Sequence, residues 1–304
     1  MNALHSVLVA VDGPSKAGST FFMDAVAAEA THQGSAIPRI LADARPESVG
    51  GRMRPSVKGE LAELQRLTAF RSIVRISAGN AFRAAALHVI SEAAKGHAIT
   101  TFNNNPEAAQ SVLSIFQDPG QHDRLQHDPA IGVQVSKVAQ MAGVQVLCRT
   151  VFCNAVVSAY NANGGGNLVI ADARGPVEQL LWHGSVGSQP GKIEAASILP
   201  VYIHTPVDIS AARLGGNLQE KIAYVAGRRR DDAERTEFPV IVPDELIEDY
   251  DEWLKQFAVP AIGGNVALPL RIDNGAANPA NIQYLGGMVA SLAQGVAYTL
   301  GRRV

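Results

Sequence analysis

The chain of 304 residues has few cysteines, few aromatic residues and little net charge. Its two cysteines, Cys148 and Cys153, are too few for a disulfide framework and match no zinc-binding spacing, so we expect both to be buried in a helix. A net charge of −2 gives no general attraction for nucleic acid or anionic membranes. Polar residues interrupt the uncharged stretches 150–171 and 274–301, which excludes a membrane span of roughly 20 apolar residues. We therefore predict a cytoplasmic protein with neither a nucleic acid polymer nor a membrane as partner, and leave its oligomeric state open.

Apolar runs alternate with helical patterns along the chain, which predicts an α/β fold with a mostly parallel sheet covered by helices. The predicted strands are Ser6–Val11, Ser72–Ile76, Asn167–Ala171, Ser197–Ile203 and Ala267–Ile272. The predicted helices are Thr20–Ala30, Gly79–Ala94 and one or two within Ile131–Ala162.

The first predicted strand leads into a segment with the spacing of a phosphate-binding loop. Gly13 and Gly18 stand at the G-x-x-x-x-G spacing of a Walker A motif. In such a loop, backbone N–H groups turn toward phosphate oxygens, and the following helix adds its positive N-terminus. The motif then requires Lys and Ser or Thr; Ser19 takes the lysine position and Thr20 that of the Mg²⁺-binding hydroxyl. Lys16 lies inside the loop instead.

Two further positions suit the binding of phosphate and metal. Asp172 closes the strand Asn167–Ala171, where a Walker B acid holds Mg²⁺, and Arg174 follows it at the ligand-binding end of the strand. The plain alternative for Asp172 is an ordinary strand-ending aspartate. Arg83 lies near the start of an apolar helix, where it either extends to solvent or points at an anionic ligand.

A charged segment near the end of the third quarter of the chain has helical spacing. Arg228, Asp232 and Arg235 stand at i, i+4 and i+7, so that a helix places them on one face. Two guanidiniums beside a carboxylate suit a bound phosphate, although a solvated helix end with internal ion pairs has the same pattern. His122 and His127, five residues apart in what reads as a polar loop, match no common metal-ligand spacing.

Five segments, taken in order, resemble motifs of the bacterial cytidylate kinases, and the end of the chain resembles the end of that family's sequences. The opening VAVDGPSKAGST is similar to the family's IDGPSGSGKST, and ISAGNAFRAAAL at Ile76–Leu87 resembles D-[TS]-G-A-M-Y-R-A-x-A-L. VSKVAQMAGV at Val135–Val144 resembles V-S-x-V-A-x-I-P-x-V, and LVIADARG at Leu168–Gly175 resembles L-V-A-D-G-R-D. RRRDDAER at Arg228–Arg235 reproduces R-x-x-x-D-x-x-R, and LRIDNG followed by a helix resembles the family's last strand and helix.

The resemblance implies a fold and an activity. The fold is a P-loop NTPase with three α/β/α layers and a parallel sheet, in a single domain over 1–304. It would have an insertion at about 34–70, an acceptor-binding region at about 76–160 and a lid at about 205–245. The implied activity is Mg²⁺-dependent transfer of the ATP γ-phosphoryl group to CMP, dCMP or a related acceptor. Two alternatives are a kinase for a modified nucleotide or other small metabolite, and a nucleotide-binding pseudokinase without turnover.

The resemblance also assigns roles to individual residues. The residues implied to bind ATP are Gly13, Pro14, Ser15, Lys16, Ala17, Gly18, Ser19, Thr20 and Arg213. Those implied to bind the acceptor are Arg83, Ser136, Arg174, Arg228, Asp232 and Arg235. Those implied to hold Mg²⁺ are Thr20 and Asp172. Those implied to act in catalysis are Lys16, Asp172, Arg174 and Arg228.

The chain departs from the family on both the donor and the acceptor side. Ser19 replaces the Walker lysine, so another cation must take over if the chain is a kinase; Lys16 is the first choice. The alternatives, which a closing lid would bring in, are Arg213, Arg228 and Arg229. On the acceptor side, Gln145 replaces a phosphate-binding arginine, and Arg149 one turn later would cover part of the same space.

Overall fold

The computed structural model describes residues 5–13, 18–32, 70–233, 270–274 and 279–301. Its sheet has five parallel strands in the order β2-β3-β1-β4-β5. The strands are β1 (Val7–Asp12), β2 (Ser72–Ser77), β3 (Asn167–Asp172), β4 (Ile198–His204) and β5 (Leu270–Asp273). All five predicted strands are confirmed to within a few residues, and so is the parallel α/β architecture; residues 267–269 of the last predicted strand lie outside the described residues.

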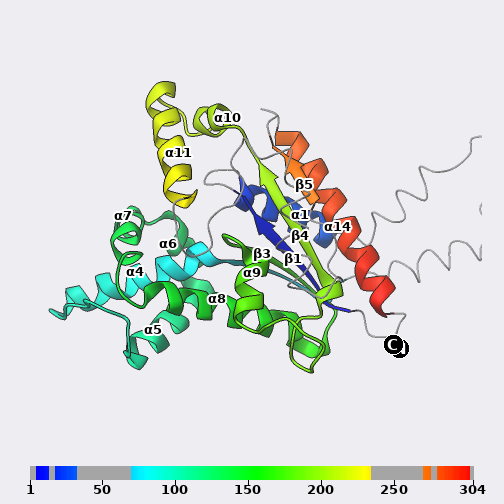
Figure 1. Cartoon of the computed structure of the whole chain (residues 1–304), viewed down its shortest axis with the longest axis horizontal. Coiled ribbons are helices and arrows are strands. Elements are labelled where there is room, and N and C mark those ends of the chain that lie inside the picture. Colours follow the sequence, from blue (N-terminus) through cyan, green and yellow to red (C-terminus); the bar gives the residue numbers. More distant parts are fainter. Residues whose placement is uncertain (1–4, 14–17, 33–69, 234–269, 275–278, 302–304) are drawn as a thin grey trace, which may run out of the picture.

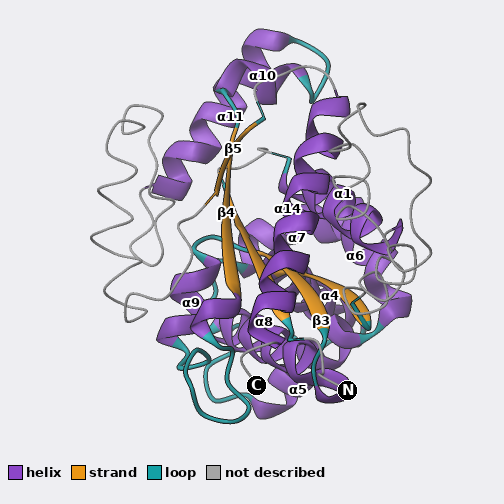
Figure 2. Cartoon of the chain, turned by 90° about the vertical axis from the view of Figure 1, so that its right-hand side faces the viewer, coloured by secondary structure: helices purple, strands orange, loops and turns teal. Residues whose placement is uncertain are grey.

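Helices cover both faces of the sheet and give three layers (Figures 1 and 2). One face packs against α1 (Ser19–His32) and α14 (Pro279–Gly301), and the other packs against α8 (Val144–Asn161) and α9 (Pro176–Trp182). Alternate residues of β1 serve the two layers, because side chains alternate along a strand. Val7, Val9 and Val11 face α1 and α14. Leu8 and Ala10 face the opposite layer. The continuous apolar run in the sequence is thus a strand buried on both faces.

The strand order creates a topological switch point between β1 and β3. These strands are neighbours in the sheet, but β1 is followed by α1 on one face and β3 by α9 on the other. In open parallel sheets, ligands bind at the carboxyl ends of the strands at such a point. The fold therefore places the chain's candidate site at the ends of β1 and β3.

A group of helices follows β2 and forms a core of its own. It comprises α4 (Ala78–Ala94), α5 (Pro106–Gln117), α6 (His122–His127), α7 (Pro129–Val138) and part of α8. The helices α5 and α7 each begin with a proline behind a capping side chain: Asn105 accepts from the backbone N–H of Ala108, and Asp128 from that of Ala130. The sequence predicted one or two helices within 131–162, and the structure has two, α7 and α8. The prediction of a polar loop around His122 and His127 is wrong, because these residues form α6.

Two helices stand beyond the carboxyl end of β4, toward which its arrowhead points in Figure 1. They are α10 (Val207–Ala212) and α11 (Leu218–Ala233). Val225 of α11 is fully buried. Four residues further along the helix, Arg229 donates from Nη2 to the carbonyl of Thr205 (2.6 Å) and to Oγ of Ser210 (2.8 Å). These contacts attach α11 to α10. The part of the expected lid from 234 to 245 and the expected insertion from 34 to 69 lie outside the described residues.

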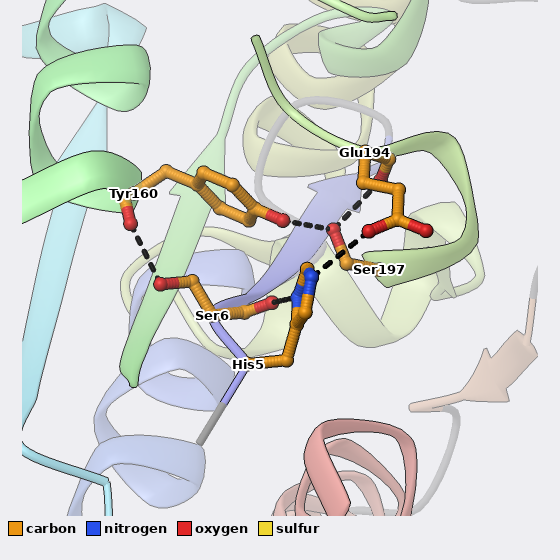
Figure 3. A network of polar contacts seen from close by, with 5 residues as sticks. All are labelled: His5, Ser6, Tyr160, Glu194 and Ser197. Atoms are coloured by element: carbon orange, nitrogen blue, oxygen red, sulfur yellow. Dashed lines mark hydrogen bonds and ion pairs between the residues drawn. The ribbon is translucent and has the colours of Figure 1, made fainter. Parts of the chain in front are cut away.

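A network of polar contacts closes the amino-terminal edge of the sheet, at the opposite ends of the strands from the switch point (Figure 3). Ser6, which precedes β1, donates to the carbonyl of Tyr160 (2.6 Å), whose hydroxyl lies 2.7 Å from Oγ of Ser197. Ser197 precedes β4 and donates to the carbonyl of Glu194 (2.7 Å). The carboxylate of Glu194 pairs with His5 (2.9 Å). The network joins β1, α8 and β4, and thus fixes the strand ends away from the candidate site.

The two cysteines of the chain lie in one helix. Cys148 and Cys153 are both buried in α8 and unpaired, as predicted, and burial raises the pKa of each thiol, that of Cys153 to about 12. Among the helices that the structure describes, none combines the length and the apolar character needed to cross a membrane.

Candidate functional site

Three segments distant in the sequence meet at Asp172. In the sheet register, Asp172 at the end of β3 lies beside Val11 of β1 and Ser77 of β2. The Ser77 hydroxyl donates to Oδ2 of Asp172 at 3.1 Å. Ser19, the first residue of α1, donates a second side-chain hydrogen bond to the same carboxylate. Asp172 is therefore the point where β2, β3 and the start of α1 converge.

The charge of Asp172 is set by its surroundings. Burial raises the pKa of Asp172 above the usual value, because a carboxylate loses hydration in the interior. The hydrogen bond from Ser19 and the positive charge of Arg174 act in the opposite direction, as do Ser77 and Arg83. The carboxylate is thus partly buried and surrounded by donors and cations, which suits an oxygen ligand for a divalent ion.

Two arginines bring positive charge to this edge of the sheet. Arg174, two residues after Asp172, is close enough to lower the pKa of both Asp172 and Asp12. Arg83 extends from the first turns of α4, and its guanidinium donates from Nη1 to Oδ1 of the buried Asn80 at 3.5 Å. Its charge also reaches Asp172. The structure therefore brings both predicted arginines to the predicted aspartate.

Two further carboxyl groups at the site were not among the predicted residues. Asp12 ends β1, accepts from the backbone N–H of Gly13 at 2.7 Å, and has its pKa raised by burial to about 6. Burial, together with the charge of Asp12, raises the pKa of Glu178 in the first turn of α9 to about 7. Gly175, with φ +55°, leaves room for the Glu178 side chain, because a Cβ on residue 175 would lie 3.0 Å from Oε2 of Glu178. Asp12 could have been found from its place at the end of a strand, whereas nothing in the sequence marks Glu178.

The structure describes the two ends of the predicted phosphate loop. Gly13 follows β1 directly, and Gly18 precedes α1 with a φ of +93°, a conformation that favours glycine. At the start of the helix, Ser19 contacts Asp172 while Thr20 is exposed. The hydroxyl beside the aspartate therefore belongs to the residue that spacing had placed in the lysine position. Residues 14–17, which include Pro14, Ser15, Lys16 and Ala17, lie outside the described part of the chain.

Arg213 reaches the same loop from the end of α10. Its Nη2 donates to the backbone carbonyl of Asn274 at 2.7 Å and to Oδ1 of the same residue at 3.1 Å. Asn274 follows β5 directly and is 6% exposed. Its Nδ2 lies 2.8 Å from where a Cβ on Gly18 would be. Arg213, Asn274 and Gly18 thus contact one another. Asn274 was not among the predicted site residues.

The remaining predicted residues lie elsewhere or outside the described region. Ser136 is exposed on α7, and Arg228 is exposed on α11. The side chain of Asp232 and the whole of Arg235 are not among the described parts. The suggested substitute Arg149 is buried, and its guanidinium lies 4.6 Å from the ring centre of Trp182 on α9.

The described part of the chain contains no group of three or more His, Cys, Asp or Glu side chains that would hold a metal by themselves. A zinc-type site is therefore not formed there. Mg²⁺ differs, because it keeps several waters and is commonly held by one or two carboxylates together with substrate phosphates. The oxygen atoms of Asp172 and Ser19 fit that requirement.

Comparisons with known proteins add no further support for an assignment. No protein-family model matches this chain, and none of the curated proteins matches it either.

Proposed function

We propose that the chain is a Mg²⁺-dependent phosphotransferase that transfers the γ-phosphoryl group of ATP to CMP, dCMP or a related phosphate-bearing acceptor. The observation that carries the proposal is the convergence on Asp172. A partly buried carboxylate at the end of β3 accepts hydrogen bonds from Ser19 at the start of α1 and from Ser77 at the end of β2. It lies at the switch point of a parallel sheet, next to the strand that leads into the glycine-spaced loop.

The donor side consists of the loop and the start of α1. The helix has 14 residues, so its N-terminal N–H groups favour a bound phosphate. Asp172 and the Ser19 hydroxyl are the residues that would hold Mg²⁺, and the ion would neutralise charge on the phosphate oxygens. We assign the metal-side hydroxyl to Ser19 because it contacts Asp172, and Thr20 takes a place at the exposed rim.

The acceptor side consists of the two arginines near Asp172. Phosphoryl transfer needs in-line positioning and neutralisation of charge more than covalent help from the protein. Arg83 on α4 and Arg174 after β3 would hold an acceptor phosphate close to the metal. In this proposal, the helices from α4 to α8 form the acceptor-binding region. Ser136 on α7 and Arg228 on α11 would contact the acceptor only after these helices have closed over the bound molecule.

A nucleotide-binding protein without turnover is the second candidate. It is favoured by the lack of a lysine after Gly18, since the residue there makes a hydrogen bond to Asp172 instead of supplying a charge. Loss of a cation from a desolvated phosphate site costs about 10²- to 10⁴-fold in rate.

The test is a coupled assay of ADP formation by the pure protein with ATP, Mg²⁺ and each nucleoside monophosphate in turn. We expect turnover with CMP or dCMP, and at least about 100-fold lower kcat/KM in Asp172→Asn. Asp118→Asn, which changes an exposed aspartate before the short helix Pro119–Gln121, is the matched control.

Three other results would change the assignment. Thermal stabilisation by MgATP without ADP formation would establish the second candidate. ADP formed only on addition of a metabolite fraction would point to an acceptor other than a common nucleotide. A protein that binds no nucleoside triphosphate would contradict all of these functions.

A further inference from the structure

Ser77 stands where a serine usually caps a helix, but it does not cap α4. Its backbone is extended (φ −117°, ψ 126°), as the residue before a helix requires, yet its hydroxyl makes no capping hydrogen bond. The helices α5 and α7 show the contrast, because Asn105 and Asp128 each accept from a backbone N–H of the helix that follows. Ser77 instead donates its hydroxyl hydrogen to Oδ2 of Asp172 at 3.1 Å. The hydroxyl therefore serves the carboxylate and not the helix.

We propose that Ser77 is a positioning residue for Asp172, whose hydrogen bond fixes the orientation in which that carboxylate would hold Mg²⁺. The inference rests on the proposed function and adds to the same site a residue that the family resemblance leaves without a role. The terminal torsion of an aspartate side chain has broad energy minima, so the hydrogen bonds to its oxygens decide how the carboxylate is turned. Carboxylates that bind metals are commonly held in this way, and loss of the partner weakens metal binding about 10- to 100-fold.

The sheet places the hydroxyl beside the carboxylate. Ser77 and Asp172 are register partners at the carboxyl ends of the parallel strands β2 and β3. Their side chains lie on the same face of the sheet, because side chains alternate in step along paired strands. Ser77 is also the residue that precedes α4, and α4 carries Arg83. The hydrogen bond thus connects the carboxylate to the helix that would hold the acceptor phosphate.

The same two strands carry a second serine contact of the same kind at their other end. Ser72, the first residue of β2, donates to Oδ1 of Asn167, the first residue of β3, at 2.7 Å. These two residues are register partners as well. Their contact lies at the amino ends of the strands, away from the switch point. A purely structural role for Ser77 therefore predicts that removal of either hydroxyl has the same kind of effect.

The experiment compares the affinity of the protein for AMP-PNP, a non-hydrolysable analogue of ATP, in Mg²⁺ and in EDTA by calorimetry. The ratio of the two dissociation constants measures how much the metal contributes to binding. Ser77→Ala should lower this ratio about 10-fold or more and leave the affinity in EDTA unchanged. Ser77→Thr keeps the hydroxyl and should retain most of the ratio. Ser72→Ala should leave the ratio unchanged, although it should lower the urea midpoint about as much as Ser77→Ala does.

A double-mutant cycle shows whether Ser77 acts through Asp172. Asp172→Ala by itself should remove most of the metal-dependent gain in affinity. Addition of Ser77→Ala to that variant should then change the ratio no further, because the hydroxyl has lost the carboxylate that it orients.

The possible outcomes separate this inference from the proposed function. If the unmodified protein binds no AMP-PNP, or if Asp172→Ala leaves the ratio unchanged, the proposed function fails and the inference with it. If Asp172→Ala lowers the ratio but Ser77→Ala does not, only the inference fails. An equal loss of the ratio in Ser72→Ala would reduce Ser77 to a structural role. Weaker binding in EDTA by Ser77→Ala would place the hydroxyl on the nucleotide itself, and would also overturn the positioning role.

Discussion

Substitution of Glu178 by glutamine tests the electrostatics at the ends of β1 and β3 without removing any of the residues proposed to bind a nucleotide. Glu178 is partly buried, and burial together with the charge of Asp12 raises the pKa of Glu178 from 4.5 to about 7. The folded protein therefore binds this proton more tightly than the unfolded chain does. Its stabilising contribution is complete below pH 4.5 and is lost as the pH rises through about 7.

The expected magnitude follows from the change in proton affinity. At about 1.4 kcal/mol per pKa unit, the full effect above pH 7 is about 3 kcal/mol. Glu178 is coupled to Asp12, which also titrates near pH 6, so we expect the measured value to be nearer about 2 kcal/mol. Glutamine has the shape of the protonated acid and no charge. The variant should therefore match the unmodified protein at pH 5 and exceed its free energy of unfolding by about 2 kcal/mol at pH 8.

Urea unfolding followed by circular dichroism at the two pH values measures this difference. Glu92 provides the control with the opposite sign, because hydrogen bonds from Lys95 and His97 lower the pKa of this partly exposed glutamate to about 2. A lowered pKa stabilises the fold above pH 4.5, so Glu92→Gln should not stabilise the protein at pH 8. An equal effect of Glu178→Gln at pH 5 and pH 8 would show that the burial of this carboxyl group is not the cause.

The remaining predictions concern packing. Gly286→Ala should lower the free energy of unfolding by about 1–3 kcal/mol, because its Cβ would lie 2.7 Å from that of Ala25 where α14 crosses α1; an unchanged denaturation midpoint would contradict the close crossing. Tyr160→Phe should cost about 1 kcal/mol through loss of the buried contact with Ser197, and its effect should be independent of pH between 5 and 8. Cys148 should resist a thiol reagent in the native protein and react after unfolding, since it is buried in α8 with a raised pKa; fast native reaction would place it at the surface.

The central strands of the sheet were predictable because they are buried on both faces. A strand covered by helices on each side reads as a short, continuous apolar run, and Val7–Asp12 and Asn167–Asp172 have that pattern in full. The strand-terminal position of Asp172 followed from the same pattern. The short helix α6 was missed, since its polar residues have no helical periodicity of apolar side chains to detect.

The contacts among residues distant in sequence required the tertiary structure. Sequence spacing placed Thr20 at the metal-side hydroxyl, but the turn into α1 directs Ser19 to Asp172. Likewise, nothing in the sequence connects Asn274, which follows β5, with Gly18 before α1 and with Arg213 at the end of α10. The sequence by itself determined where apolar runs become strands and where glycines and charges follow them, because these are local properties of the chain. Which charged groups share an edge depends on strand order, and strand order is decided only by how the helices pack across the sheet.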